Sequence, residues 1–287
     1  MPVQPETQLE RDVLPPCAVG MPSTNLPGSA WMLALALVAF GIWLHLSDLN
    51  VRWFTWIHST SVFPDFFWAN ATLLGFGWAV LIVITAFDRE HGRWAAASMI
   101  AVVLGGVLIA IAKRIAYHPR PTAVLEASSF SVIGEPIFQS GSMPSGHAAG
   151  AAALVALLIL ALLERGQLTK LRATVLVLLG MCVAWSRVAV GAHWPADVVV
   201  GVVLGLLASL GAYRVVNFGT RSQQSLSATQ LKHRMWWLCS LELGLASVCF
   251  GTDTGQPLAV EFQGFLGGLA LLSCLWRLRR VLGRSGA

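Results

Sequence analysis

Two histidines and one carboxylate are the residues of this chain best suited to chemistry. His193 and Asp197 stand four residues apart, and Pro195 between them suits the first position of a helix. A carboxylate that accepts one imidazole N–H fixes the tautomer and raises the basicity of the other ring nitrogen, which becomes a nucleophile. His147, when protonated, can give its proton to a leaving oxygen. This combination favours a displacement at phosphorus.

Five further residues are of the kind that bind a phosphate. Arg has a planar fork that matches phosphate oxygens, and the first N–H groups of a helix have no partner within the helix. A glycine lets the backbone approach the anion because it has no Cβ. The candidates for this role are Lys113, Arg120, Ser145, Gly146 and Arg187. Catalysis would then rest on positioning and charge neutralisation, which require neither a metal nor a cofactor.

Three short stretches carry all eight residues. They are "KRIAYHPRP" at 113–121, "PSGH" at 144–147 and "SRVAVGAHWPAD" at 186–197. Each lies at the end of an apolar segment. From the second stretch the chain runs through one apolar segment, turns at "ERGQLTK" and returns to the third stretch. The connectivity therefore brings the three stretches to the same end of the predicted helices.

The composition decides the class of protein. Of the 287 residues, 56% are hydrophobic and only 11% are charged, and the mean hydropathy is +0.68. A soluble domain of this length carries far more charge, so the sequence indicates an all-α bundle of transmembrane helices. Eight passes are predicted, over residues 30–46, 66–87, 94–112, 147–163, 171–186, 197–216, 235–252 and 262–276. The Gly-rich stretch at 264–272 leaves a re-entrant segment open as an alternative to the last pass.

The Lys and Arg residues are distributed unequally between the two sides that these passes define. With the N-terminus in the cytoplasm, 14 of the 19 lie on the inner side and five on the outer side. This is the bias of the positive-inside rule, so both termini are expected in the cytoplasm. The outer five include Lys113, Arg120 and Arg187, which places the three stretches on the outer face.

Taken alone, each of these residues has a plainer explanation. Lys113 at a helix end commonly extends to the lipid headgroups, Ser145 could be an N-cap, and Asp197 could complement a helix dipole. Several ionisable groups gathered on one membrane face favour a functional site over coincidence. Gly201 and Gly205 are more typical of helix packing. The five cysteines have no spacing typical of a disulfide framework or a metal site.

The spacing of the eight residues resembles the three-part signature of the type 2 phosphatidic acid phosphatase superfamily. The matching motifs are Lys113-x6-Arg120-Pro121, Pro144-Ser145-Gly146-His147 and Ser186-Arg187-x5-His193-x3-Asp197. The resemblance covers residues 70–216 and implies a six-helix phosphatase core. It implies that His193 attacks phosphorus, that Asp197 orients His193, and that His147 protonates the leaving group. By the same resemblance, the phosphate oxygens are held by Lys113, Arg120, Ser145, Gly146 and Arg187.

The chain is expected to divide into three parts. Residues 1–29 are rich in proline and without a hydrophobic period, which is typical of a disordered tail, here cytoplasmic. Residues 30–218 would form the membrane phosphatase core, and residues 219–287 a C-terminal extension with one or two membrane helices. The connector at 122–143 is long, and we expect it to form an outer lid or interfacial segment that shapes lipid access.

These observations predict a multi-pass lipid phosphate phosphatase of the bacterial inner membrane, with its active site facing the periplasm and a phosphohistidine intermediate. The substrate expected first is undecaprenyl diphosphate, because that carrier lipid needs dephosphorylation on this face. Phosphatidylglycerol phosphate, phosphatidic acid and lipid A are alternatives, as is transfer of the phosphoryl group to an acceptor other than water. A membrane protein that only binds lipid phosphates is the alternative from another class. Membrane lipids are expected partners and nucleic acid is not, and the sequence leaves the oligomeric state open.

Overall fold

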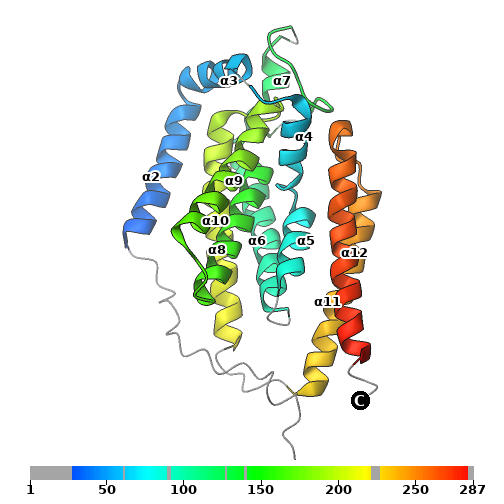
Figure 1. Cartoon of the computed structure of the whole chain (residues 1–287). Helices are drawn as coiled ribbons and strands as arrows, with labels where there is room; N and C mark the ends of the chain where they lie inside the picture. Colours follow the sequence, from blue (N-terminus) through cyan, green and yellow to red (C-terminus); the bar gives the residue numbers. More distant parts are fainter. Residues whose placement is uncertain are drawn as a thin grey trace, which may run out of the picture.

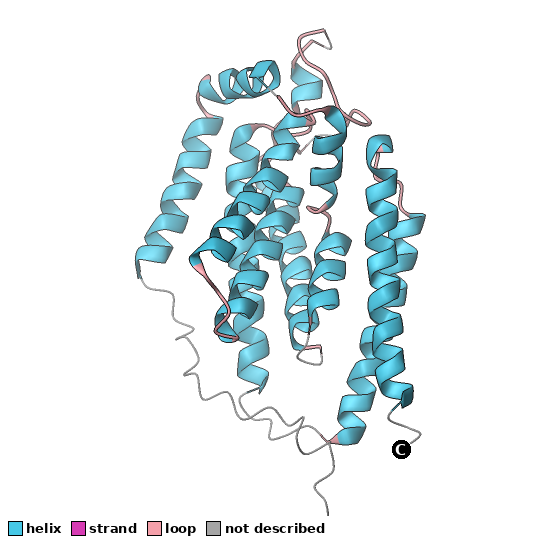
Figure 2. Cartoon of the chain, viewed as in Figure 1, coloured by secondary structure: helices cyan, strands magenta, loops and turns pink. Residues whose placement is uncertain are grey.

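The computed structural model describes residues 28–60, 62–88, 92–126, 128–138, 141–220 and 227–283. Over these residues the chain forms helices and no strand, as Figure 2 shows. The prediction of an all-α fold is confirmed, whereas residues 1–27 of the expected tail lie outside the described residues. The helices are α2 (Gly28–His45), α3 (Leu49–Thr60), α4 (Asp65–Leu73), α5 (Gly77–Phe87), α6 (Arg93–Ile115), α7 (Pro121–Val124), α8 (Gly146–Glu164), α9 (Lys170–Ala189), α10 (Pro195–Thr220), α11 (Ala228–Gly251), the 3₁₀ turn η1 (Pro257–Ala259) and α12 (Val260–Gly283).

Several of these helices can cross a membrane. Five are long and apolar enough alone, namely α6, α8, α9, α10 and α12, and two bent pairs, α2 with α3 and α4 with α5, would bring the number to seven. The helix α11 forms over the predicted seventh pass but is not among those that meet this criterion. Because α12 is continuous, the re-entrant alternative for 264–272 is wrong. The chain is a multi-pass membrane protein, as its composition predicts.

The centre of the bundle is built from α6, α8 and α10, with α9 beside them (Figure 1). A face of small residues brings α10 onto the first turns of α8. A Cβ at Gly201 would lie 2.4 Å from the carbonyl oxygen of Ser145, and a Cβ at Gly205 would lie 2.1 Å from that of Ala149. The two backbones therefore touch, and the predicted packing role of these glycines is confirmed.

Replacing Gly205 with Ala should destabilise the protein strongly. The new Cβ meets backbone atoms of α8, which cannot rotate away as a side chain would, so the two helices must separate. Overpacking of this kind costs about 1–3 kcal/mol, which should appear as a lower midpoint of thermal unfolding in detergent. The matched control is Gly268→Ala in α12, where a Cβ would meet nothing within 4 Å. An unchanged midpoint for Gly205→Ala would contradict the close approach of α10 to α8.

The segment predicted as a pass over 66–87 is not one straight helix, because the chain breaks at 74–76 and bends by 70° between α4 and α5. The cause is the approach of α8 to this point. A Cβ at Gly75 would lie 2.8 Å from both the Cβ and the carbonyl oxygen of His147. Only a residue without a side chain fits there. The break leaves Phe76, the residue that precedes α5, directly beside α8.

An ion pair joins the three central helices at the end where α8 terminates. Arg93 of α6 donates from Nη1 and Nη2 to the two carboxylate oxygens of Glu164, at 2.6 and 2.7 Å. The hydroxyl of Tyr213 in α10 donates to the same carboxylate at 2.6 Å. A bidentate Arg–carboxylate pair has a defined geometry. It therefore fixes how α6, α8 and α10 sit relative to one another, and with them the opposite end of the bundle.

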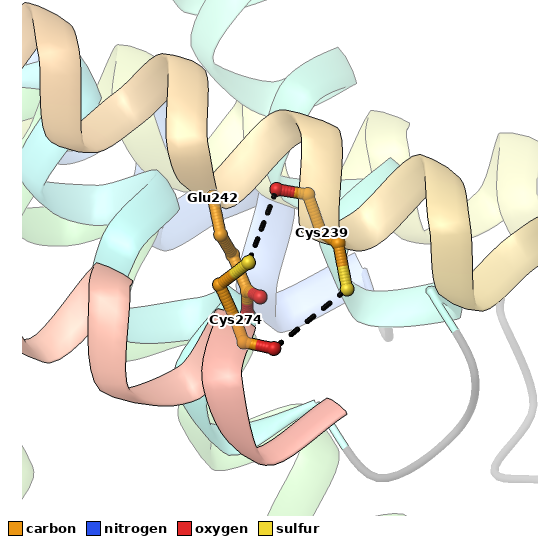
Figure 3. Close-up of side chains that lie close together, drawn as sticks. All are labelled: Cys239, Glu242 and Cys274. Atoms are coloured by element: carbon orange, nitrogen blue, oxygen red, sulfur yellow. Dashed lines mark hydrogen bonds between the residues drawn. The ribbon is translucent and has the colours of Figure 1, made fainter. Parts of the chain in front are cut away.

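The C-terminal extension is a hairpin of two helices, α11 and α12, which lies along α5 (Figure 1). Buried apolar residues of the hairpin share one cluster with Ala79 and Ile82 of α5. Between the two helices of the hairpin, the thiols of Cys239 and Cys274 each contact the backbone carbonyl of the other residue, at 3.8 and 3.7 Å (Figure 3). These contacts let α11 and α12 approach closely without leaving the thiols unpartnered.

A buried arginine joins the two helices of the hairpin to each other and to α5. In α12, Arg277 donates from Nε to Oε1 of Glu242 at 3.0 Å, and both residues are nearly inaccessible, at 2% and 0% exposed. The Nη2 of Arg277 donates to the carbonyl oxygens of Thr85 and Asp88, at the end of α5. The carbonyl oxygen of Thr85 also accepts the backbone N–H of Asp88 at 3.1 Å, so Arg277 is a second donor at the end of α5. Arg277 therefore connects α5 with both helices of the hairpin.

Candidate active site

The loop between α9 and α10 carries the candidate nucleophile. His193 lies two residues before the start of α10, and its ring is buried. Its Nδ1 is 3.2 Å from Oδ2 of Asp197, which belongs to the first turn of α10. The same oxygen accepts the backbone N–H of Trp194 at 3.0 Å and the hydroxyl of Ser142. These donors hold the carboxylate still, so that it favours the tautomer of His193 with its proton on Nδ1.

The other ring nitrogen of His193 faces a cation. Arg120 places Nη1 3.3 Å from Nε2 of His193 and donates from the same atom to the carbonyl oxygen of Ala192, at 2.7 Å. Burial lowers the pKa of His193 well below its ordinary value, and the charges of Arg187, Arg120 and Lys113 lower it further. The imidazole is therefore neutral, and its Nε2 lone pair points toward positive charge.

Arg187 supports this loop from the last turn of α9. Its carbonyl oxygen accepts the backbone N–H groups of Ala192 and His193, both at 3.1 Å. Its Nη1 donates to Oγ1 of Thr72 in α4 at 2.6 Å, whereas its buried Nε has no hydrogen-bond partner among the described residues. A buried donor without a partner is costly. The Nε–H of Arg187 is therefore placed to bind an anion.

Lys113 adds a third cation from the last turn of α6. Its half-buried side chain passes Gly141, where a Cβ would lie 3.9 Å from the lysine Cδ. Its charge acts together with those of Arg120 and Arg187, and the carboxylate of Asp197 opposes them. Three cations against one carboxylate leave an excess of positive charge, which favours an anion such as phosphate.

The start of α8 closes the other side of the site. Ser145 is the N-cap of this helix: its Oγ accepts from the backbone of Ala148 at 3.4 Å, and its own N–H donates to the carbonyl oxygen of Asp197 at 2.9 Å. Gly146, the first helical residue, is exposed. His147 is half-buried, and its Nε2 has no hydrogen-bond partner within the described part of the chain. The helix start therefore offers free N–H groups and an uncommitted imidazole nitrogen.

Comparison with known protein families gives a match for the helices that carry these residues. The model of the PAP2 superfamily matches residues 92–221, which hold α6, α8, α9 and α10 and all eight candidate residues. This part of the chain is similar to the PAP2 superfamily. The resemblance that the three motifs indicate is confirmed. PAP2 proteins are phosphatases, so the match supports a phosphoric ester hydrolase.

Comparison with solved structures finds LpxE from Aquifex aeolicus. It is 25% identical in sequence, with a TM-score of 0.49, and the match covers 59% of this chain and 97% of that chain. A comparison with curated proteins gave no significant match. The α11–α12 hairpin and the α4–α5 pair both lie outside the PAP2 match.

The structure brings the eight predicted residues to one end of the PAP2 helices, and it adds three that the sequence did not indicate. Ser142 orients Asp197, Thr72 binds Arg187, and the ring of Phe76 lies against His147. Ser142 stands just before the PSGH motif, but hydroxyl residues are too common for that position to stand out. The other two lie before the PAP2 match, where no motif marks them.

The charged groups of the PAP2 site are the three cations Lys113, Arg120 and Arg187 and the carboxylate of Asp197. Among the described residues, one group of potential metal ligands lies together, and it is elsewhere: Cys239, Glu242 and Cys274 (Figure 3). There the carboxylate Oε1 already accepts from Arg277 and from Ser273.

Proposed function

We propose that this chain hydrolyses a lipid phosphate through a phosphohistidine on His193. The Nε2 lone pair attacks phosphorus, the P–O bond to the lipid breaks, and His147 gives its proton to the departing oxygen. Water then attacks phosphorus, the P–N bond breaks, and His147 takes a proton from that water. The observation that carries this proposal is the 3.2 Å contact of Nδ1 with Asp197, which leaves Nε2 beside the cations.

The remaining candidate residues would stabilise the charge that develops on phosphorus oxygens. Arg187 offers its unpartnered Nε–H, and Arg120 is already beside the attacking nitrogen. Lys113 contributes charge, while Ser145 and Gly146 contribute the N-terminal end of α8. Donors fixed in advance cost no reorganisation when the charge appears, which is why such sites accelerate phosphoryl transfer.

The surface of the bundle supports a substrate that resides in the membrane. Leu171, Leu178 and Met181 of α9 expose apolar side chains along the helix that leads to Arg187. We propose undecaprenyl diphosphate as the first substrate, with phosphatidylglycerol phosphate, phosphatidic acid and lipid A as the other candidates. A protein that only binds lipid phosphates would not need a carboxylate to fix the tautomer of His193, so catalysis is the better interpretation.

Phosphate release from a panel of these four lipids in detergent tests the proposal. We expect release from at least one of them, fastest for undecaprenyl diphosphate, with no loss when a metal chelator is present. His193→Ala serves as the blank. No release from any lipid, together with tight binding of one of them, would favour the binding protein, and strong inhibition by the chelator would contradict the metal-independent mechanism. Appearance of the phosphoryl group on an added alcohol would indicate transferase activity.

Reporter fusions test the proposed orientation in the bacterial inner membrane, in which the active site faces the periplasm. Fusions after residues 165 and 225 are expected to report a cytoplasmic location, because both lie on the side that holds most of the Lys and Arg residues. A fusion within 128–138 is expected to report the periplasm. Periplasmic signals after 165 and 225 would reverse the topology.

A further inference from the structure

The C-terminal hairpin lies outside the PAP2 match, yet it packs on the residue that contacts His147. The rings of Phe76 and His147 meet edge to face, with centroids 4.3 Å apart. Phe76 also packs into two apolar clusters, and Phe262 at the start of α12 packs into the same two. A chain of apolar contacts therefore leads from the hairpin to the imidazole of His147.

The hairpin holds both ends of α5, the helix that begins directly after Phe76. At the far end, Arg277 binds the carbonyl oxygens of Thr85 and Asp88. At the near end, the cluster around Phe262 receives Phe76 itself. Because a helix fixed at both ends cannot tilt, the position of Phe76 depends on the hairpin.

A second connection runs from the turn of the hairpin to the loop of the nucleophile. The side chain of Gln256 donates from Nε2 to the carbonyl oxygen of Ile133 at 3.2 Å, and the N–H of Glu135 donates to that of Gly255 at 2.8 Å. The N–H of Ile133 in turn donates to the carbonyl oxygen of Val190 at 3.3 Å. The connector thus joins the hairpin to the loop that bears the nucleophile.

His147 depends on packing for its orientation. Its Nε2, the atom that would give the proton, has no hydrogen-bond partner among the described residues. The backbone on which it stands is pressed against Gly75, immediately before Phe76. An imidazole whose reactive nitrogen must stay free for substrate has to be aimed by its neighbours.

We propose that the α11–α12 hairpin positions the proton donor of the reaction, with Phe262 holding Phe76 against the imidazole of His147. Phe262 and Phe76 are positioning residues, since neither touches the reacting atoms. The proposal rests on the proposed role of His147. It assigns to the extension, which the family match does not include, a part in the first chemical step.

The proposal has a consequence that a loss of folding would not reproduce. An alkoxide leaving group needs a proton as the P–O bond breaks, whereas p-nitrophenolate, with a pKa near 7, leaves without one. Misplacing the general acid should therefore lower kcat/KM for an alkyl phosphate and spare kcat/KM for p-nitrophenyl phosphate, because kcat/KM covers only the steps up to the phosphohistidine. Fewer folded molecules would lower both rates equally.

The experiment compares Phe262→Ala with Leu272→Ala in the full chain. Both residues belong to α12, but Leu272 is 66% exposed and serves as the control. For Phe262→Ala we expect kcat/KM to fall on the order of 10-fold on a short-chain alkyl phosphate, a part of the 10²–10⁴-fold that a general acid supplies. The value of kcat/KM for p-nitrophenyl phosphate should stay within about 2-fold of the wild type, and Leu272→Ala should match the wild type on both substrates.

His147→Ala is the reference that separates this proposal from the proposed function. It should show the same selective loss, to a larger extent. If it does and Phe262→Ala does not, because both rates fall equally or neither falls, the positioning role is wrong and the function stands. If His147→Ala slows both substrates equally, the proton-donor role is wrong, and the positioning role fails with it. Should Phe262→Ala not fold, Phe262→Leu, which keeps an apolar side chain, is measured in its place.

Discussion

His193→Ala should abolish phosphate release from every substrate that the wild type accepts. Without Nε2 no bond to phosphorus can form, and the cations alone cannot replace a covalent step. Loss of the nucleophile from a cooperating catalytic group typically costs on the order of 10⁴–10⁶ in rate. The measurement is inorganic phosphate released per mole of folded protein, with the phosphoenzyme trapped at alkaline pH, where a phosphohistidine persists.

The control for this variant is His233→Ala, which removes an exposed histidine from α11. It should release phosphate at the rate of the wild type. The trapped phosphoenzyme should be present in the wild type and in His233→Ala, and missing from His193→Ala. If His193→Ala were nearly as active as the wild type, His193 would not be the nucleophile and no phosphohistidine would form on it.

Arg187→Ala is expected to lower kcat by about 10²–10³, the range for removing a single donor from a preorganised, water-excluded site. Three functions are lost together: the unpartnered Nε–H, the bond to Thr72, and one of the charges that keep His193 neutral. Because the pKa of His193 would rise on losing that charge, the activity of the variant should fall earlier than that of the wild type as the pH is lowered.

Arg114→Ala is the matched control, since Arg114 is an exposed arginine in the last turn of α6. It should leave kcat unchanged. Arg187→Lys should recover only part of the rate, because an ammonium group keeps the charge but loses the planar fork. A loss in Arg187→Ala no greater than that in Arg114→Ala would exclude Arg187 from the site.

Much of this arrangement could be predicted from the sequence, for definite physical reasons. Apolar segments of membrane length have few structural options, so the central helices were predicted at nearly their observed positions. The four-residue spacing of His193 and Asp197 puts them on one turn at a helix start, where the structure finds them in contact. The order of the helices along the chain is enough to predict that the end of α6, the start of α8 and the end of α9 lie at the same end of the bundle.

The parts that could not be predicted depend on contacts between distant segments. The break at 74–76 is caused by the approach of α8, which leaves no signal within the 66–87 segment beyond a glycine. Likewise, Thr72 acquires its role only through Arg187, which lies 115 residues later. An aromatic residue such as Phe76 is common in a membrane segment, so nothing in the sequence indicates its contact with His147.

The guanidinium of Arg277 has a consequence for how the protein is made. Its partner carbonyl in α5, that of Thr85, precedes it by 192 residues. During synthesis α5 therefore leaves the ribosome and enters the bilayer long before Arg277 is made. A chain ended at the limit of the PAP2 match would carry all three motifs but would lack Arg277. The unit that sequence comparison recognises is thus smaller than the unit that Arg277 connects.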